Sequence, residues 1–116
     1  MGFEYDRIVE ITTLPNSAGA VFANPAGQKT YIRLVVLHNS NSTAEAVKLY
    51  NVPDNAGAVG TAGTTNEFYS RSMAAGETVT MEFAIPGLVL EDGNDTIQGV
   101  TTTASKVTIQ AYGGKE

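Results

Sequence analysis

His38 is the side chain best suited to acid–base chemistry, because it is the only histidine and the chain contains no cysteine. Catalysis by such a group requires a nucleophile or a second acid–base group beside it. His38 stands at the end of an apolar run and precedes Asn39, where a histidine ordinarily caps a turn. No serine occurs in the Gly-x-Ser-x-Gly pattern of a nucleophile elbow. We therefore predict no catalytic residue and no enzyme activity.

The densest set of possible metal ligands is the acidic segment 91–95, Glu-Asp-Gly-Asn-Asp. Oxygen ligands at this density are typical of calcium sites. The calcium-loop pattern fails, however, because Thr96 and Ile97 stand where the last Asx and the glycine belong. An acidic hairpin turn between Leu90 and Ile97 is the simpler interpretation, since Asp-Gly and Asn-Asp favour tight turns. We predict no metal ion.

No other cofactor or nucleic-acid site is indicated. Gly57, Gly60 and Gly63 are not followed by the Gly-Lys-Ser/Thr of a phosphate loop. The 7 Lys and Arg residues are scattered singly in a chain of net charge −5, so no basic stripe exists to bind nucleic acid. Charged residues make up only 16% of the chain, against roughly 25% in a typical domain. Such a surface suits packing against protein neighbours.

Alternating apolar residues predict the strands that would position these groups. The continuous apolar run 30–38 and the alternating run 45–52 predict two strands of a β-hairpin. Segment 77–85 alternates most regularly, and we expect one face of it to point inward: Val79, Met81, Phe83 and Ile85. Segment 106–112 repeats the pattern, whereas 67–71 and 95–101 are weaker strands. No helical periodicity is sustained.

These strands predict an all-β domain, an antiparallel β-sandwich of jelly-roll or immunoglobulin-like Greek-key topology. We divide the single domain into residues 1–29, an N-terminal arm or edge strand plus a loop that makes assembly contacts, and 30–116, the sandwich. Segment 3–13 is either an arm that adds to a neighbour's sheet or an ordinary first strand. The loops 14–29 and 53–65 are interpreted as surfaces that order against a partner, and residues 113–116 as a disordered tail.

Aromatic and apolar residues outside the expected core are candidates for a protein interface, because such side chains anchor many interfaces. Partial burial under a neighbouring loop is the alternative for the tyrosines. The candidate interface residues are Phe3, Tyr5, Ile8, Phe22, Val59, Tyr50 and Tyr112.

The chain resembles the small β-sandwich virion proteins of tailed bacteriophages over about residues 30–112. The resemblance rests on the succession of strands and turns at 30–39, 42–50, 75–80, 90–97 and 103–107. It implies a capsid decoration (cement) protein, commonly a trimer, that binds the outer surface of the head and bridges major capsid subunits. A tail-, neck- or fibre-associated virion protein is the alternative, and a carbohydrate-binding module is a third reading.

The resemblance also implies localisation in the virion, after synthesis in the host cytoplasm. The partner would be the major capsid protein or another virion protein, with no direct contact to nucleic acid or membrane. The N-terminus has no basic start and no long apolar stretch, so we expect no signal peptide. No apolar run approaches the roughly 20 residues that cross a bilayer.

Overall fold

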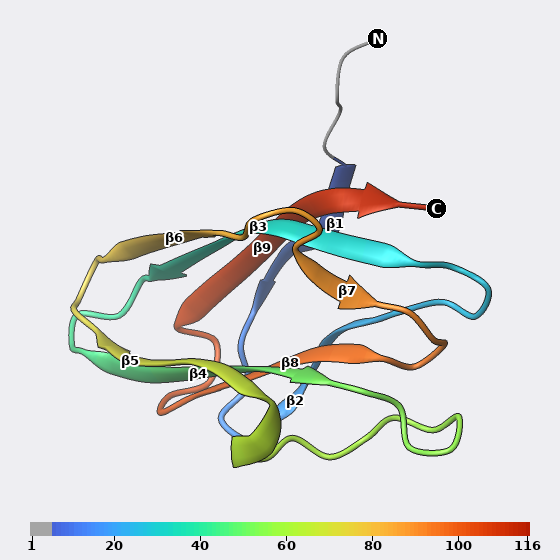
Figure 1. The fold of residues 1–116 in the computed structure, drawn as a ribbon. Coiled ribbons are helices and arrows are strands. Elements are labelled where there is room, and N and C mark those ends of the chain that lie inside the picture. The colour runs from blue at the N-terminus through green and yellow to red at the C-terminus, as the bar shows by residue number, and fades with distance from the viewer. Residues whose placement is uncertain (1–5) are drawn as a thin grey trace, which may run out of the picture.

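The computed structural model describes residues 6–116 and is a sandwich of two antiparallel sheets (Figure 1). The fold class predicted above is therefore confirmed. Among residues 6–116 the one helical element is the single 3₁₀ turn η1 (Thr64–Asn66). The strands are β1 (Asp6–Thr13), β2 (Gly19–Ala23), β3 (Thr30–Asn39), β4 (Glu45–Val52), β5 (Glu67–Met73), β6 (Thr78–Glu82), β7 (Leu88–Leu90), β8 (Thr96–Thr101) and β9 (Val107–Lys115).

Strand pairing follows the course of one long hairpin that has been rolled up. Sheet I has the order β1-β9-β3-β6, with β7 pairing beside β6 on the same edge of β3, and sheet II has the order β2-β8-β4-β5. Each strand thus pairs with its counterpart from the other end of the chain: β1 with β9, β2 with β8, β3 with β6 and β7, and β4 with β5. This order, with β6 and β7 as one interrupted strand, is that of a jelly roll.

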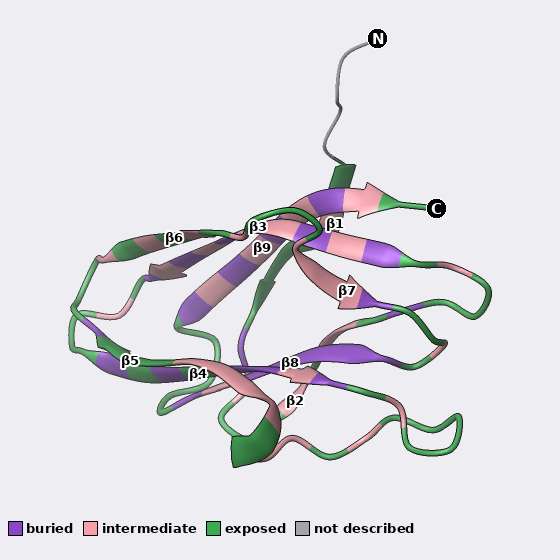
Figure 2. Ribbon diagram, in the orientation of Figure 1, coloured by how far each residue is buried: buried purple, intermediate pink, exposed green. Residues whose placement is uncertain are grey.

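The core lies between the two sheets and consists of aliphatic side chains at alternate strand positions (Figure 2). The inward positions expected in 106–112 are confirmed, since Val107, Ile109 and Ala111 are buried. The buried cluster is Val9, Leu14, Ile32, Val35, Leu37, Val47, Leu49, Met73, Leu90, Ile97, Val107, Ile109 and Ala111.

The predicted hairpin of 30–38 with 45–52 is wrong, although both strands exist. β3 belongs to sheet I and β4 to sheet II, so the connection crosses between the sheets. Asn39, which is fully buried, makes this crossing possible. Its Nδ2 lies 3.1, 3.1 and 3.2 Å from the carbonyl oxygens of Thr43, Met73 and Ala74, and its Oδ1 accepts the Asn41 N–H.

Glu45, 1% exposed, holds the next part of the same corner. Its two carboxylate oxygens accept the Thr103 N–H at 2.7 Å and the Asn41 side-chain amide at 2.8 Å. Burial acts to raise the pKa of this carboxyl, but these hydrogen bonds and the charge of Lys106 outweigh it, so the pKa lies below its ordinary value. The carboxylate is therefore a structural acceptor for a connection between the sheets.

Three other segments differ from expectation. The loop expected at 14–29 contains β2, a five-residue strand, Gly-Ala-Val-Phe-Ala, without the β-branched run that marks a strand. The strand expected at 77–85 ends at Glu82, because the chain turns through 83–87, and Ile85 is 80% exposed instead of buried. The tail 113–116 is ordered: β9 runs to Lys115, and Glu116 exchanges backbone hydrogen bonds with Lys29.

Residues 6–13 do not form a separate arm. β1 is an edge strand of sheet I that pairs with β9 from Asp6 opposite Gly113 to Thr13 opposite Thr108. The structure therefore has the ordinary first strand in place of a segment donated to a neighbour.

Gly113 yields a test of the packing at the centre of sheet I. A Cβ at this position would lie 1.7 Å from the Tyr31 carbonyl oxygen, whereas a Cβ at Gly114 would meet nothing within 4 Å. Because the obstacle is backbone, we expect Gly113→Ala to lower the free energy of unfolding by at least about 2 kcal/mol, measured by urea denaturation. Gly114→Ala is the matched control and should change it by less than about 0.5 kcal/mol. Equal stability of the two variants would contradict this packing.

Candidate functional site

His38 lies within β3, one residue before the strand ends, and its ring Nδ1 is 2.9 Å from Thr78 Oγ1 on β6. The residue is paired with Thr78 in the strand register. It therefore belongs to the sheet and does not cap the turn that was expected at this position. In the described part of the chain no carboxylate is hydrogen-bonded to this ring.

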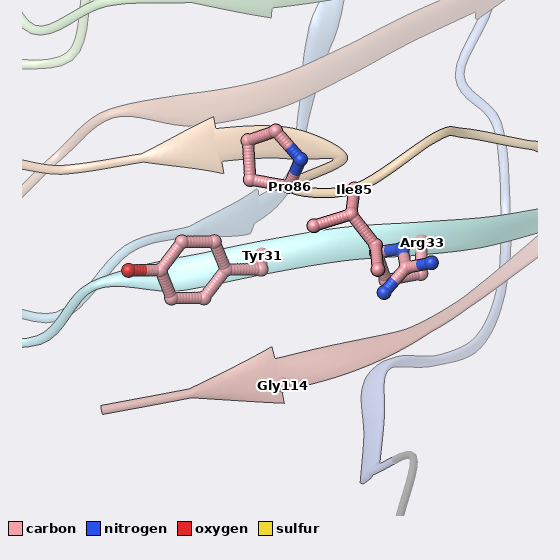
Figure 3. Close-up of a pocket in the computed structure, with 5 residues that line it drawn as sticks. All are labelled: Tyr31, Arg33, Ile85, Pro86 and Gly114. Atoms are coloured by element: carbon pink, nitrogen blue, oxygen red, sulfur yellow. The ribbon is translucent and has the colours of Figure 1, made fainter. Parts of the chain in front are cut away.

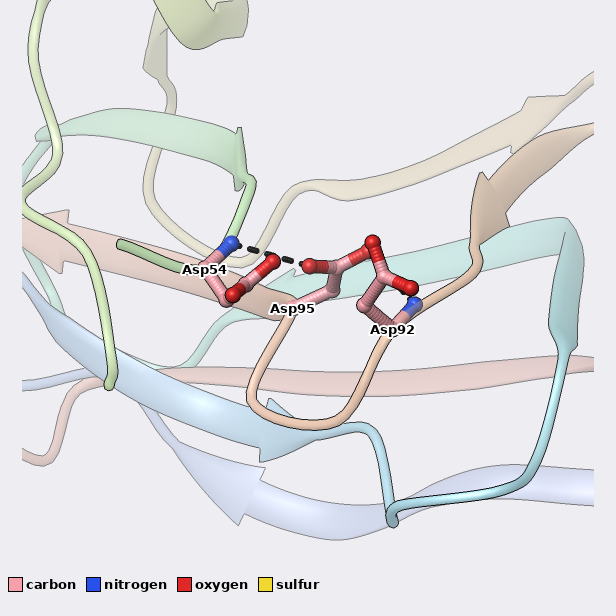
Figure 4. A group of neighbouring side chains, drawn as sticks. All are labelled: Asp54, Asp92 and Asp95. Atoms are coloured by element: carbon pink, nitrogen blue, oxygen red, sulfur yellow. Dashed lines mark hydrogen bonds between the residues drawn. The ribbon is translucent and has the colours of Figure 1, made fainter. Parts of the chain in front are cut away.

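The acidic segment forms a turn, and Asp54 joins it from the end of β4 (Figure 4). Carboxylate oxygens of Asp54, Asp92 and Asp95 lie within 4.8 Å of one another. Asp95 is 8% exposed, and its oxygens accept the backbone N–H groups of Asp54 at 2.8 Å, Glu91 at 3.0 Å and Asp92 at 3.1 Å. The turn is not a hairpin, because β7 and β8, which flank it, belong to different sheets.

Asp95 is therefore occupied by backbone donors. Burial acts to raise its pKa, but the hydrogen bonds from Asp92, Asp54 and Glu91 outweigh burial and hold the pKa below its ordinary value. The Asp95 carboxylate thus accepts hydrogen bonds from three backbone N–H groups where the chain passes between the sheets. The arrangement explains the acidic cluster as a structural turn. Sequence analysis did not assign Asp54 to this cluster, because nothing in its local sequence indicates that it lies beside residues 92 and 95.

The candidate interface residues fall in different places. Phe3 and Tyr5 lie outside the described residues. Ile8 on β1 and Phe22 on β2 are half-buried and pack against the core from one side of the sandwich. Val59 is 49% exposed.

Tyr50 is not an available anchor, because it is 8% exposed. It points away from the core as expected, but its neighbour across the strands, Gln98, donates a hydrogen bond to the Gly60 carbonyl at 3.0 Å. The loop 53–63 thus folds back over the outer face of sheet II and covers Tyr50. This loop, which we interpreted as ordering against a partner, is ordered against its own sheet.

The outer face of sheet I is different, since the described segment that lies over its central strands is the short turn 83–87 at one end (Figure 1). Tyr112 lies here, half-buried, with the Arg7 guanidinium 5.8 Å from its ring centroid. The register places mainly uncharged residues side by side across β9, β3 and β6, with Glu82 opposite Leu34 on the β6 edge. We call the following set the sheet I face: Leu34, Val36, His38, Thr78, Thr80, Glu82, Thr108, Gln110 and Tyr112.

A hollow of about 230 Å³ continues this face at the end where the chain turns from β6 to β7 (Figure 3). It is lined by Tyr31 and Arg33 of β3, Gly114 of β9, and Ile85 and Pro86 of the turn. Ile85, at 80% exposure, is the most exposed large apolar residue of the described chain. Sequence reasoning placed it inward because the alternation continues to position 85; the Pro86-Gly87 pair directly after it is the signal that the strand ends earlier.

The Arg33 guanidinium is held at this hollow by a hydrogen bond from its Nε to the Phe83 carbonyl at 3.2 Å. The Tyr31 hydroxyl donates to a Glu116 carboxylate oxygen at 2.8 Å, and this bond raises the pKa of the tyrosine. The hollow therefore presents apolar surface with fixed polar groups at its edge. Such a site can receive a side chain from another molecule.

No family model, curated protein or solved structure matches this chain. Within residues 6–116, no helix is long and apolar enough to cross a membrane.

The role of Asp95 can be tested through its pH dependence. A carboxyl whose pKa is lower in the folded chain stabilises it above the unfolded value of about 3.9, and this contribution is lost as the pH falls through the folded value. Asp95→Asn should lower the free energy of unfolding at pH 7 by about 2 kcal/mol, because an amide N–H₂ would face a backbone donor. Urea denaturation at pH 7 and pH 3 should show that acidification lowers the free energy of unfolding of Asp95→Asn by less than that of the unmodified protein.

Asp92→Asn is the control, because the Asp92 side chain is exposed and the Asp95 carboxylate keeps its three backbone N–H donors in this variant. We expect it to change stability little at either pH. A calcium-dependent rise in melting temperature that Asp95→Asn abolishes would contradict the structural role.

Proposed function

We propose that this chain is a structural protein of a tailed-bacteriophage particle, a decoration protein that binds the outer surface of the head and bridges major capsid subunits. Jelly rolls serve viral capsids and lectins, in which the fold presents a rigid surface. The resemblance over residues 30–112 favours the virion among these settings. The binding would need buried area and shape, and no reactive group.

The observation that carries this proposal is the bare sheet I face together with the hollow beside it. The loop 53–63 covers the Tyr50 and Gln98 end of the outer face of sheet II, whereas no loop of this length covers the sheet I face, whose one carboxylate, Glu82, lies on its β6 edge. Apolar surface of this kind in a rigid sheet is typical of protein–protein contact. Ile85 is the natural anchor, since hot-spot residues are large side chains that become fully desolvated on binding.

Loss of the protein from particles tests the proposal. Deleting the gene in the phage that carries it should remove density from the head surface in electron micrographs and lower the temperature at which heads rupture. Loss of density at the tail or neck would favour the alternative virion location. Absence of the chain from purified particles by mass spectrometry would overturn the proposal, and binding to a glycan array would favour the carbohydrate-binding module.

Ile85 allows a sharper test with purified protein and heads from the deletion strain. Ile85→Lys should weaken binding at least about tenfold in a sedimentation assay, because it places a charge on the surface to be desolvated. Ala46→Lys, which adds the same charge at an exposed position of sheet II, should bind normally. Equal binding by both variants would show that the sheet I side does not meet the head.

A further inference from the structure

β2 forms an edge of sheet II whose outer side has no strand beside it in the described chain. It pairs only with β8, and no backbone hydrogen bond reaches residues 19–23 from any other described segment. Such an edge presents N–H and C=O groups that pair readily with another strand. Natural proteins ordinarily blunt such edges with charge, proline, bulges or cover.

The other three edges carry that protection. β1 has Arg7 and Glu10 and two register shifts against β9. β5 has Glu67 and Arg71, and Arg71 forms an ion pair with Glu77. The fourth edge is formed by β6, which contains Glu82, and by β7, which is uncharged but only three residues long.

β2 has no charge and no proline, and it carries one register shift, between Ala20 and Phe22. It lies at the centre of the longest uncharged segment in the chain, residues 11–28. Ile11, in this segment, is 57% exposed. The edge is thus the least protected against pairing.

A second uncharged segment lies on the same sheet. Residues 55–66 contain no charge, and Gly60 of this loop accepts a hydrogen bond from Gln98, the register partner of Ala20. The loop therefore lies against β8, the strand that pairs with β2, and adds no charge there. The exposed Val59 belongs to this loop.

The two sides of the sandwich also differ in how they are closed. At the β5–β6 side, Phe68 and Phe83 form an edge-to-face ring pair with centroids 6.0 Å apart. At the β1–β2 side, Ile8, Val21 and Phe22 cover the core but remain half-buried. Apolar surface is thus left available at the side where the unprotected edge lies.

We propose that two copies of this chain associate through β2, antiparallel and across a two-fold axis, so that their four-stranded sheets join. With the axis at Val21, the large Phe22 of each copy lies opposite the small Ala20 of the other, and Gly19 lies opposite Ala23. Matching of large and small residues permits close approach of the two strands.

A second copy fits better than a charged partner because this surface offers no counter-charge. Each copy carries a net charge of −5, so self-association is least opposed where the segments that meet are uncharged. The resemblance to virion proteins implies a trimer; a two-fold β2 pair instead gives a dimer. This inference does not depend on the proposed function.

Light scattering coupled to size exclusion tests the pairing directly. The unmodified chain should have twice the monomer mass of 12.2 kDa at concentrations of about 100 μM, as expected of a weak strand-paired dimer. Ala20→Lys and Ala20→Glu, at an exposed position, should each give monomers with an unchanged circular dichroism spectrum. Mixing these two variants should restore the dimer, which a folding defect would not allow.

Thr80→Lys is the matched control, because it adds the same charge at an exposed position of the β6 edge, and it should remain a dimer. A monomer at every concentration, a trimer, or a dimer that both Ala20 variants leave intact would overturn the proposal.

Discussion

The fold depends on how backbone polar groups are satisfied where the chain crosses between the two sheets. In a jelly roll these crossings are buried, and an unpaired N–H or C=O there costs about 1–3 kcal/mol. Four buried polar side chains meet this need: Asn24, Asn39, Glu45 and Asp95. Asn24, for example, donates to the carbonyls of Gln28 and Asp92. Aliphatic residues in the core can exchange with one another far more freely than these residues can, so the crossings specify which strand enters which sheet.

The rolled hairpin makes the two outer faces of the molecule unequal. The connection between β4 and β5 is its tip, and this long loop folds back over the outer face of sheet II. The chain has no corresponding loop for sheet I in the described residues, so that face is bare apart from the turn that carries Ile85. A rigid body with one partly covered face and one largely bare face is suited to fixed attachment, and this asymmetry is the physical basis of the proposed function.

Sequence patterns located most strands and left their partners undetermined. Alternation identified β4 and β9, and a continuous apolar run identified β3, because both patterns are local properties of the sequence. These patterns do not show which strand pairs with β3. The crossing to the other sheet at Asn39 could not be predicted, because Asn39 resembles an ordinary turn residue until its buried hydrogen bonds are known. Tyr50 was assigned to the correct face, but the loop that covers it is a tertiary feature. Gly113 resembled a flexible tail, although it is a glycine because the Tyr31 carbonyl approaches too closely for a side chain.

A reconstruction of the intact particle by electron cryomicroscopy would show whether the chain attaches through the sheet I face, as we propose. We expect density for this jelly roll on the head, with β3 and β9 and the turn at Ile85 against the shell and the loop 53–63 facing solvent. Density in the opposite orientation, with that loop against the shell, would rule out attachment through sheet I.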